Sequence, residues 1–153
     1  MSIFHSLNTT ASALTAGRLR MDVISSNMAN ADSTRGKFVD GKWEPYRRKT
    51  VVLQQKEGSF SSHLQTALNP NDPASAGNGV VVSKIQEDTT TPFKMEYDPE
   101  NPDANQDGYV ELPNVDPLRE MVDLMSATRS YEANVTVFNA SKGMMMKALE
   151  IGK

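Results

Sequence analysis

The segment with the clearest potential for chemistry is Asp103–Gly108, with the sequence DANQDG. Side-chain oxygens at alternate positions followed by a glycine are typical of the opening of an EF-hand calcium loop. That loop also needs a bidentate glutamate at its twelfth position, which here is Asn114, while Glu111 falls at position nine. Because Asn and Asp side chains also bond their own backbone in ordinary turns, we favour a turn. A small calcium-binding module is the alternative.

Neither histidine belongs to a catalytic or metal-binding pattern. His5 and His63 lie in different segments and form no H-x-x-x-H pair. The absence of cysteine removes disulfides and thiolate metal sites. The serines before His63 lack the G-x-S-x-G pattern of a nucleophile elbow. We therefore expect a protein that is not an enzyme and that uses no cofactor, metal or small-molecule substrate.

Charge and hydropathy argue against several other classes of protein. The 153 residues carry a formal net charge of −3, whereas nucleic-acid-binding domains show a basic patch. We interpret the basic run Arg47–Lys49 as a solvated or edge-strand charge cluster. No apolar stretch approaches the ~20 residues that cross a bilayer, and Met1–Thr10 lacks the features of a secretory signal. We expect a soluble protein made in the cytoplasm, with no cleaved signal peptide.

Both ends of the chain show the apolar periodicity of long helices. Residues 3–31 repeat apolar side chains in steps of four and three without proline, and Ser2 suits an N-cap. Residues 117–150 repeat the pattern, and Asp116-Pro117 suits a helix start. The stripes include Leu7, Leu14, Met21, Ile24, Met28, Met121, Leu124, Tyr131, Val135, Phe138, Met145 and Leu149. A single long helix cannot bury its own stripe, so each helix needs a partner.

The middle of the chain predicts strands and turns. Tyr46–Gln54 and Gly79–Ile85 are rich in β-branched residues, and Phe93–Tyr97 alternates apolar and polar side chains. Gly58–Asn78, rich in Ser, Asn, Ala and Gly, predicts a loop, and Asp98–Asn114 is rich in turn residues.

The predicted fold is α+β, with the two long helices paired as an antiparallel coiled coil. They form a discontinuous domain at 1–33 and 115–153, and residues 34–114 form a small β-rich middle domain. Periodicity leaves open whether the helices pack only on each other or also on neighbouring chains. The run Met144–Met146 favours neighbours, because three consecutive helical side chains face three directions and methionine adapts to varied surfaces.

Motifs at both ends of the chain resemble those of the flagellar rod and hook proteins. Residues 24–34 (ISSNMANADST) resemble the N-terminal signature of that family, and residues 120–134 (EMVDLMSATRSYEAN) resemble its C-terminal helix. Within the family, the motifs PYRRK at 45–49, YDPENPDAN at 97–105 and GYV at 108–110 resemble proximal rod proteins of the FlgC class. The turn at 33–36 (STRG) departs from the T-P-G-Y of many relatives.

The resemblance implies a structural subunit of the bacterial flagellar basal body, assembled helically into the proximal rod. It implies terminal helices that form an inner tube, and a middle domain outside it. The implied partners are further copies, other rod proteins, the small protein that joins rod to membrane ring, and the flagellar type III export apparatus. That apparatus would deliver the chain unfolded to the periplasm without a cleaved signal. Asn27 and Asn30 would end the first helix by bonding its backbone locally.

Overall fold

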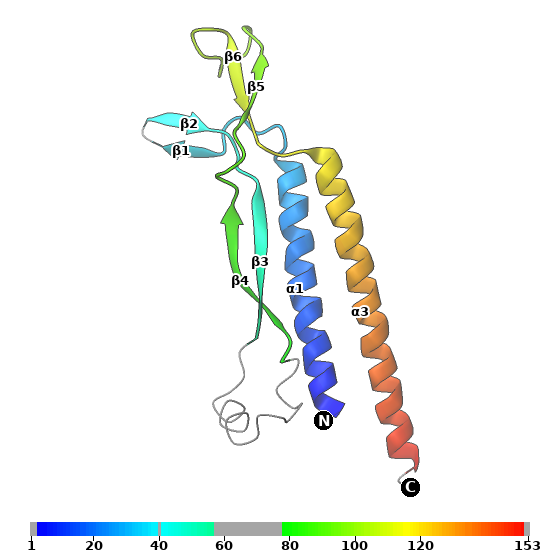
Figure 1. Ribbon diagram of the computed structural model, residues 1–153. Helices are drawn as coiled ribbons and strands as arrows, with labels where there is room; N and C mark the ends of the chain where they lie inside the picture. Colours follow the sequence, from blue (N-terminus) through cyan, green and yellow to red (C-terminus); the bar gives the residue numbers. More distant parts are fainter. Residues whose placement is uncertain (1–2, 40, 57–77, 152–153) are drawn as a thin grey trace. The chain divides into compact units, whose positions relative to one another are not determined.

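The computed structural model describes residues 3–39, 41–56 and 78–151 (Figure 1). Its elements are α1 (Ile3–Ala29), β1 (Lys37–Val39), β2 (Lys42–Glu44), β3 (Lys49–Gln55), β4 (Val80–Glu87), β5 (Lys94–Tyr97), β6 (Tyr109–Leu112) and α3 (Pro117–Ile151). The strands form three two-stranded sheets, β1-β2, β3-β4 and β5-β6. The α+β class predicted from the sequence is therefore confirmed.

The chain divides into two compact units. Unit 1 comprises residues 1–19, 52–84 and 127–153, and unit 2 comprises residues 20–51 and 85–126. Both helices and the two longest strands, β3 and β4, contribute to each unit. The division into domains at 33/34 and 114/115 stays a prediction.

The ends of the helices follow from local capping. The Asp116 carboxylate accepts a hydrogen bond from the Leu118 N–H at 3.1 Å, and Pro117 is the first residue of α3, as the sequence predicts. At the other helix, the Asn30 side chain donates to the Ser26 carbonyl at 2.8 Å, and the Ser33 hydroxyl donates to the Asn30 amide oxygen. These bonds satisfy a carbonyl in the last turn of α1 and join the side chains of two residues just past its end.

In unit 1, the first residue of β4 is hydrogen-bonded to α1, and a glycine precedes that residue. The Ser12 hydroxyl accepts a hydrogen bond from the Val80 N–H at 3.0 Å. Gly79 has a φ of +92°, and a Cβ atom on it would lie 2.5 Å from the Ser12 hydroxyl oxygen. Glycine is therefore required both by the backbone conformation and by the close approach. Elsewhere in this unit, Gly17 of α1 lies against the ring of Tyr131 of α3.

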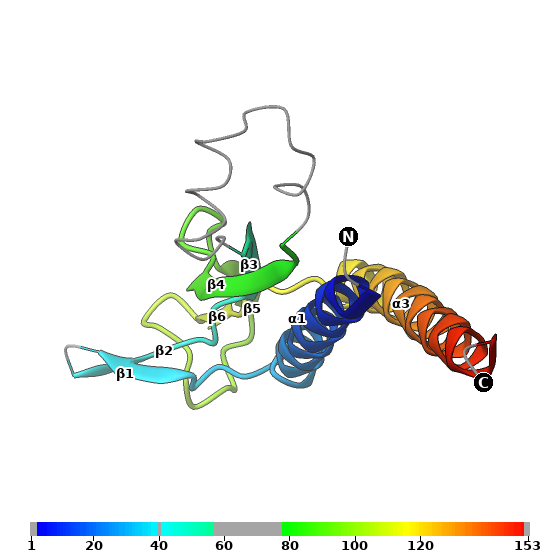
Figure 2. The same ribbon diagram turned by 90° about the horizontal axis from the view of Figure 1, so that it is seen from below.

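Unit 2 contains two hairpins whose exposed rings pair. Phe38 of β1 lies opposite Trp43 of β2, and their rings meet edge to face at 5.2 Å. Tyr97 of β5 lies opposite Tyr109 of β6, with ring centroids 5.3 Å apart. The two hairpins extend in different directions within unit 2 (Figure 1 and Figure 2).

The three strands predicted from the sequence correspond to β3, β4 and β5, each shifted by a few residues. We did not predict β1, β2 or β6. β1 and β2 have three residues each, too few to display alternation, and β6 lies within Asp98–Asn114, whose turn residues predicted no strand. Of the loop predicted at Gly58–Asn78, residues 58–77 lie outside the described part. Among the described residues, neither helix is long and apolar enough to span a bilayer.

The interior is small and partly polar. Its buried apolar side chains are Ala16, Val23, Ile24, Val110, Val115 and Ala127, and its buried polar residues are Thr10, Asn27, Asn114, Glu120 and Ser141. Buried polar groups are costly unless they are hydrogen-bonded. Those of unit 2 form the cluster described next.

Candidate functional site

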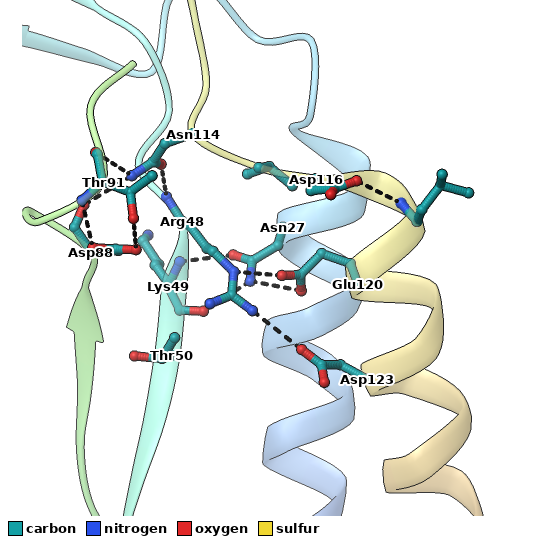
Figure 3. Close-up of polar contacts among 12 residues, drawn as sticks. Asn27, Arg48, Lys49, Thr50, Asp88, Thr91, Asn114, Asp116, Glu120 and Asp123 are labelled. Atoms are coloured by element: carbon teal, nitrogen blue, oxygen red, sulfur yellow. Dashed lines mark hydrogen bonds and ion pairs between the residues drawn. The ribbon is translucent and has the colours of Figure 1, made fainter. Parts of the chain in front are cut away.

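A buried carboxylate of unit 2, that of Glu120, lies among polar side chains from other segments (Figure 3). Glu120, in the first turns of α3, is fully buried. Its Oε1 accepts a hydrogen bond from Arg48 Nε at 2.6 Å, and its Oε2 accepts one from Asn27 Nδ2 at 3.1 Å. The Arg48 guanidinium also donates to Asp123 at 3.2 Å. The three segments that carry these residues are far apart in the sequence, so the carboxylate joins α1, the start of β3 and α3.

Asn27 uses its whole side-chain amide in this cluster. Its Nδ2 donates to the Lys49 carbonyl at 2.8 Å as well as to Glu120, and its Oδ1 accepts from the Lys49 N–H at 2.9 Å. The Tyr46 hydroxyl donates to the same Oδ1 at 3.0 Å. Asn27 thus pairs with a strand residue much as a neighbouring strand would.

This arrangement corrects the local role expected for Asn27. The residue lies inside α1, is 1% exposed, and its described side-chain bonds reach residues 19 or more positions away. Asn30, in contrast, is part-exposed and bonds locally, to Ser26 and Ser33. The physical reason for the difference is helix phase: Asn27 falls three and four residues after the buried Ile24 and Val23, so it faces the interior.

Asn114 extends the cluster to a further segment, the turn that follows β4. Its Oδ1 accepts from the Arg48 N–H at 2.8 Å, and its Nδ2 donates to the carbonyls of Asp88 and Thr91. Hydrogen bonds from the Thr90 hydroxyl and then from the hydroxyl and N–H of Thr91 hold the pKa of Asp88 well below its ordinary value. Hydrogen bonds among its own residues therefore stabilise the turn at 88–91, to which Asn114 donates.

The interpretation of Arg47–Lys49 as a solvated charge cluster was wrong for Arg48. The Arg48 side chain is 18% exposed and pairs with two carboxylates. Arg47 lies over the Phe93 ring at 4.4 Å, and Lys49 contributes its backbone to Asn27. A sequence signal did exist, because Glu120 lies four residues before Leu124 and so shares its face of the helix. A charged residue on an apolar stripe predicts a buried partner, although not which one.

The cluster is suited to holding segments together, not to catalysis. Among the described residues, no buried side-chain nitrogen or oxygen lacks a hydrogen-bond partner. The polar atoms therefore bond one another, and a saturated network of this kind fixes one geometry.

The Asp103–Gly108 loop is a turn, as favoured from its sequence. Asn105 Oδ1 accepts hydrogen bonds from the N–H groups of Asp107 and Tyr109, each at 2.9 Å. The Asp103 carboxylate binds the Arg35 guanidinium and the Thr34 hydroxyl. Within the described residues, no group of three or more acidic or histidine side chains could hold a metal ion. The structure gives the calcium-binding alternative no support.

The Arg35–Asp103 pair predicts a specific pH dependence. Hydrogen bonds from Arg35 and then from Thr34 lower the pKa of Asp103. A lowered folded-state pKa contributes stability above the ordinary aspartate pKa of about 3.9, and that contribution is lost as the pH falls through the lowered value. The Asp103→Asn variant should therefore lose less stability than the parent chain between pH 7 and pH 3. Urea unfolding at both pH values, followed by Trp43 fluorescence, measures this.

Asp107→Asn is the matched control for that experiment, because the Asp107 carboxylate forms no ion pair among the described residues. If the parent chain, the Asp107 variant and the Asp103 variant lose equal stability between pH 7 and pH 3, the ion pair has no such role.

The apolar residues predicted to pack in an assembly are only partly covered. Ile24 is buried; Leu7, Leu14, Met21, Met28, Leu124, Tyr131, Val135, Phe138 and Met145 are half-buried; Met121 and Leu149 are exposed. In one chain, Met121 and Leu149 of the α3 stripe are therefore open to solvent, whereas none of the five α1 residues is fully exposed. Of the histidines, His5 is half-buried on α1, and His63 lies outside the described residues.

Comparison with known proteins matches both ends of the chain. The family model of the flagella basal body rod protein matches residues 7–36, and that of the flagellar basal body rod FlgEFG protein C-terminal matches residues 106–151. The flagellar basal-body rod protein FlgC of Bacillus subtilis (strain 168) is 65% identical over the whole of both chains. The proteins of that name from Escherichia coli O157:H7 and Salmonella typhimurium are 42% and 41% identical, again over the whole of both chains.

The chain belongs to the FlgC family. It is a structural subunit of the flagellar basal-body rod. The matched N-terminal segment contains Asn27, and the matched C-terminal segment contains Asn114, Glu120 and Asp123. Arg48 lies between those segments. In this FlgC-family chain, the polar cluster therefore joins the two rod-protein segments to the region that separates them.

Proposed function

We propose that this chain assembles with further copies and with other rod proteins into a helical array, the proximal rod of the flagellar drive shaft. In this proposal α1 and α3 pair as an antiparallel coiled coil within residues 1–33 and 115–153 and form the inner tube. Residues 34–114 lie outside the tube. The observation that carries the proposal is the amount of apolar surface left exposed on α3.

Nine large apolar side chains of α3 are half or more exposed. They are Leu118, Met121, Val122, Met125, Val137, Met144, Met146, Leu149 and Ile151. Isolated apolar residues on a surface are ordinary, but a concentration along one element marks an interaction site. Covering these residues by neighbouring chains would contribute about 1.5–3 kcal/mol for each side chain that becomes fully buried.

The exposed residues lie on several sides of α3. Residues 118, 121, 122 and 125 follow the i, i+3, i+4, i+7 spacing of one face, whereas Met144 and Met146 are 200° apart at 100° per residue. A two-fold dimer would cover one side of the helix. Neighbours on several sides fit a helical array, in which each copy uses different surfaces toward the copies around it.

The remaining parts of the proposal follow from the rod family. The chain would reach the periplasm through the flagellar type III export apparatus, without a cleaved signal peptide. It would contact the protein that joins the rod to the membrane ring. We also propose that it carries out no enzymatic reaction and binds no nucleic acid. The acidic net charge supports the last point.

Complementation of a Bacillus subtilis strain that lacks its own FlgC tests this proposal. The parent chain should restore rods and swimming. The Leu118→Ser, Met125→Ser double variant should not, because losing two buried side chains from each interface weakens it by about 100-fold or more. Both residues are exposed, at 75% and 56%, so the free chain should still fold.

Arg119→Ser is the matched control, since Arg119 is exposed in the same turn as Leu118. Failure of the parent chain to restore rods, or full activity of the double variant, would contradict the proposal.

A further inference from the structure

All of the sulfur in this chain is in methionine, because the sequence has nine methionines and no cysteine. An oxidant converts the methionine thioether to the sulfoxide where it can reach the sulfur atom. The exposure of each side chain therefore decides which methionines react first. Among the described residues, five methionines are exposed in the single chain: Met95, Met121, Met125, Met144 and Met146.

Four of these five lie on α3, the helix whose open apolar side chains carry the proposed assembly. Met121 and Met125 are 50% and 56% exposed. Residues four apart on a helix are neighbours on one face, so the two thioethers belong to one surface, which Leu118 and Val122 complete. We call Met121 and Met125 the methionine pair.

The other methionines of unit 2 differ from the methionine pair in exposure or in position. Met21 and Met28 of α1 are half-buried. Met95 is 61% exposed but belongs to the β5-β6 hairpin, not to α3. An oxidant should therefore reach Met95 as readily as the methionine pair, and should reach Met21 and Met28 more slowly.

Oxidation would make part of this apolar surface polar. With hydrogen peroxide as the oxidant, the sulfur forms a bond to one peroxide oxygen while the O–O bond breaks. The proton on that oxygen joins the departing hydroxide as water, so the sulfur is oxidised by two electrons and the peroxide is reduced. The sulfoxide oxygen is an uncharged hydrogen-bond acceptor. Burying it among apolar side chains without a donor weakens a contact by about tenfold for each side chain.

We propose that the methionine pair is a reversible oxidation site, and that sulfoxides at Met121 and Met125 prevent the free chain from joining the rod. This inference rests on the proposed function, because it requires neighbours to cover α3. The aliphatic side chains of Leu118 and Val122 hold no sulfur, so the methionines alone make this surface sensitive to peroxide. Methionine sulfoxide reductases would restore the apolar thioethers. Free chains should be oxidised faster than assembled ones, in which neighbours cover the sulfur atoms.

The rate of sulfoxide formation at each methionine of the purified chain tests the assigned site. The chain is treated with hydrogen peroxide, and its peptides are followed by mass spectrometry. Met121, Met125 and Met95 should be oxidised several-fold faster than Met21 and Met28. Oxidation of the methionine pair no faster than that of Met28 would overturn the assignment.

Glutamine in place of the sulfoxide tests the effect on assembly without an oxidant, because its side chain ends in an uncharged polar group. In the Bacillus subtilis strain without its own FlgC, the Met121→Gln, Met125→Gln chain should build fewer rods than the parent chain by about tenfold or more. Met95→Gln, an equally exposed change outside α3, is the matched control and should build rods like the parent. Thermal unfolding of each purified chain checks that it folds. Rods at the parent number from the double variant would overturn the proposed effect.

Brief peroxide treatment of growing cells joins the two measurements. The Met121→Leu, Met125→Leu chain cannot form these sulfoxides, so its rod number should fall less than that of the parent or of Met95→Leu. Each rod number is taken relative to the same strain without peroxide, and all three strains share their other rod proteins. Equal falls in the three strains would overturn the proposal. A parent chain that restores no rods would instead contradict the proposed function, and the oxidation rates of the purified chain would still test the site.

Discussion

Replacing Glu120 with alanine should lower the free energy of unfolding by about 3–5 kcal/mol, the cost of breaking a buried ion pair from one side. Glu120 is fully buried, and its carboxylate binds both Arg48 and Asn27. Without it, the largely buried Arg48 guanidinium keeps one carboxylate partner among the described residues, the part-exposed Asp123. The variant also leaves a cavity where three segments meet.

Urea unfolding at neutral pH measures this cost, with the fluorescence of Trp43, the single tryptophan, as the signal from unit 2. Glu132→Ala, an exposed change on the same helix, is the control and should alter stability by less than about 0.5 kcal/mol. The double variant Glu120→Leu, Arg48→Met should be less damaging than Glu120→Ala, because it leaves no buried charge unpaired; Asp123, which loses Arg48, is part-exposed. A loss below about 1 kcal/mol for Glu120→Ala would contradict the structural role of the ion pair.

Replacing Asn27 with valine should cost about 2–5 kcal/mol, because it leaves one buried group and several part-buried groups without partners at once. The N–H and carbonyl of Lys49, the Tyr46 hydroxyl and one Glu120 oxygen all bond the Asn27 amide. Asn30→Val removes bonds to Ser26 and Ser33 at a part-exposed site. It should cost about 1 kcal/mol or less.

Combining the two substitutions in one chain distinguishes an effect on assembly from an effect on export. The double variant Asn27→Val, Asn30→Val should reduce rod formation more than it reduces release of the chain from the cytoplasm, since we propose that the chain is exported unfolded. Rod formation is measured by counting rods in isolated basal bodies. Export is measured by the amount of chain released from the cytoplasm. Motile cells carrying the double variant would show that the asparagines have no role in assembly.

The helices and their ends were predictable because their signals are local. Apolar spacing and the Asp116-Pro117 start place α3 within a residue of its observed bounds. α1 ends at Ala29, two residues before the predicted end, where Asn30 and Ser33 form the following turn. Turn chemistry at Asn105 was likewise readable from neighbouring residues.

The polar cluster was not predictable, because its partners are separated along the chain. Asn27 and Glu120 are 93 residues apart, and Asn114 reaches Arg48 across 66 residues. A pattern can show that Glu120 lies on an apolar face, but the choice of Arg48 as its partner depends on how the segments pack. Strands β1, β2 and β6 were missed for a different reason: they are short, and their exposed Phe38, Trp43 and Tyr109 run against the usual alternation.

The two helices therefore differ along their length in how they are stabilised. Near Asn27 and Glu120 a saturated hydrogen-bond network holds them within a single chain. Toward Ile151, large apolar side chains are exposed and need neighbours. Local opening is expected where buried contacts are few, so this part of α3 should become ordered fully only in the rod.

Amide hydrogen exchange of the purified chain and of the same chain in isolated rods tests this account most directly. We predict that residues 117–126 exchange slowly in both states, because the polar cluster is complete in the free chain. Residues 128–151 should exchange quickly in the free chain and slowly in rods, where neighbours cover α3. Equally slow exchange of 128–151 in a confirmed monomer would show a closed helical hairpin whose preformed surfaces join, and would contradict folding on assembly.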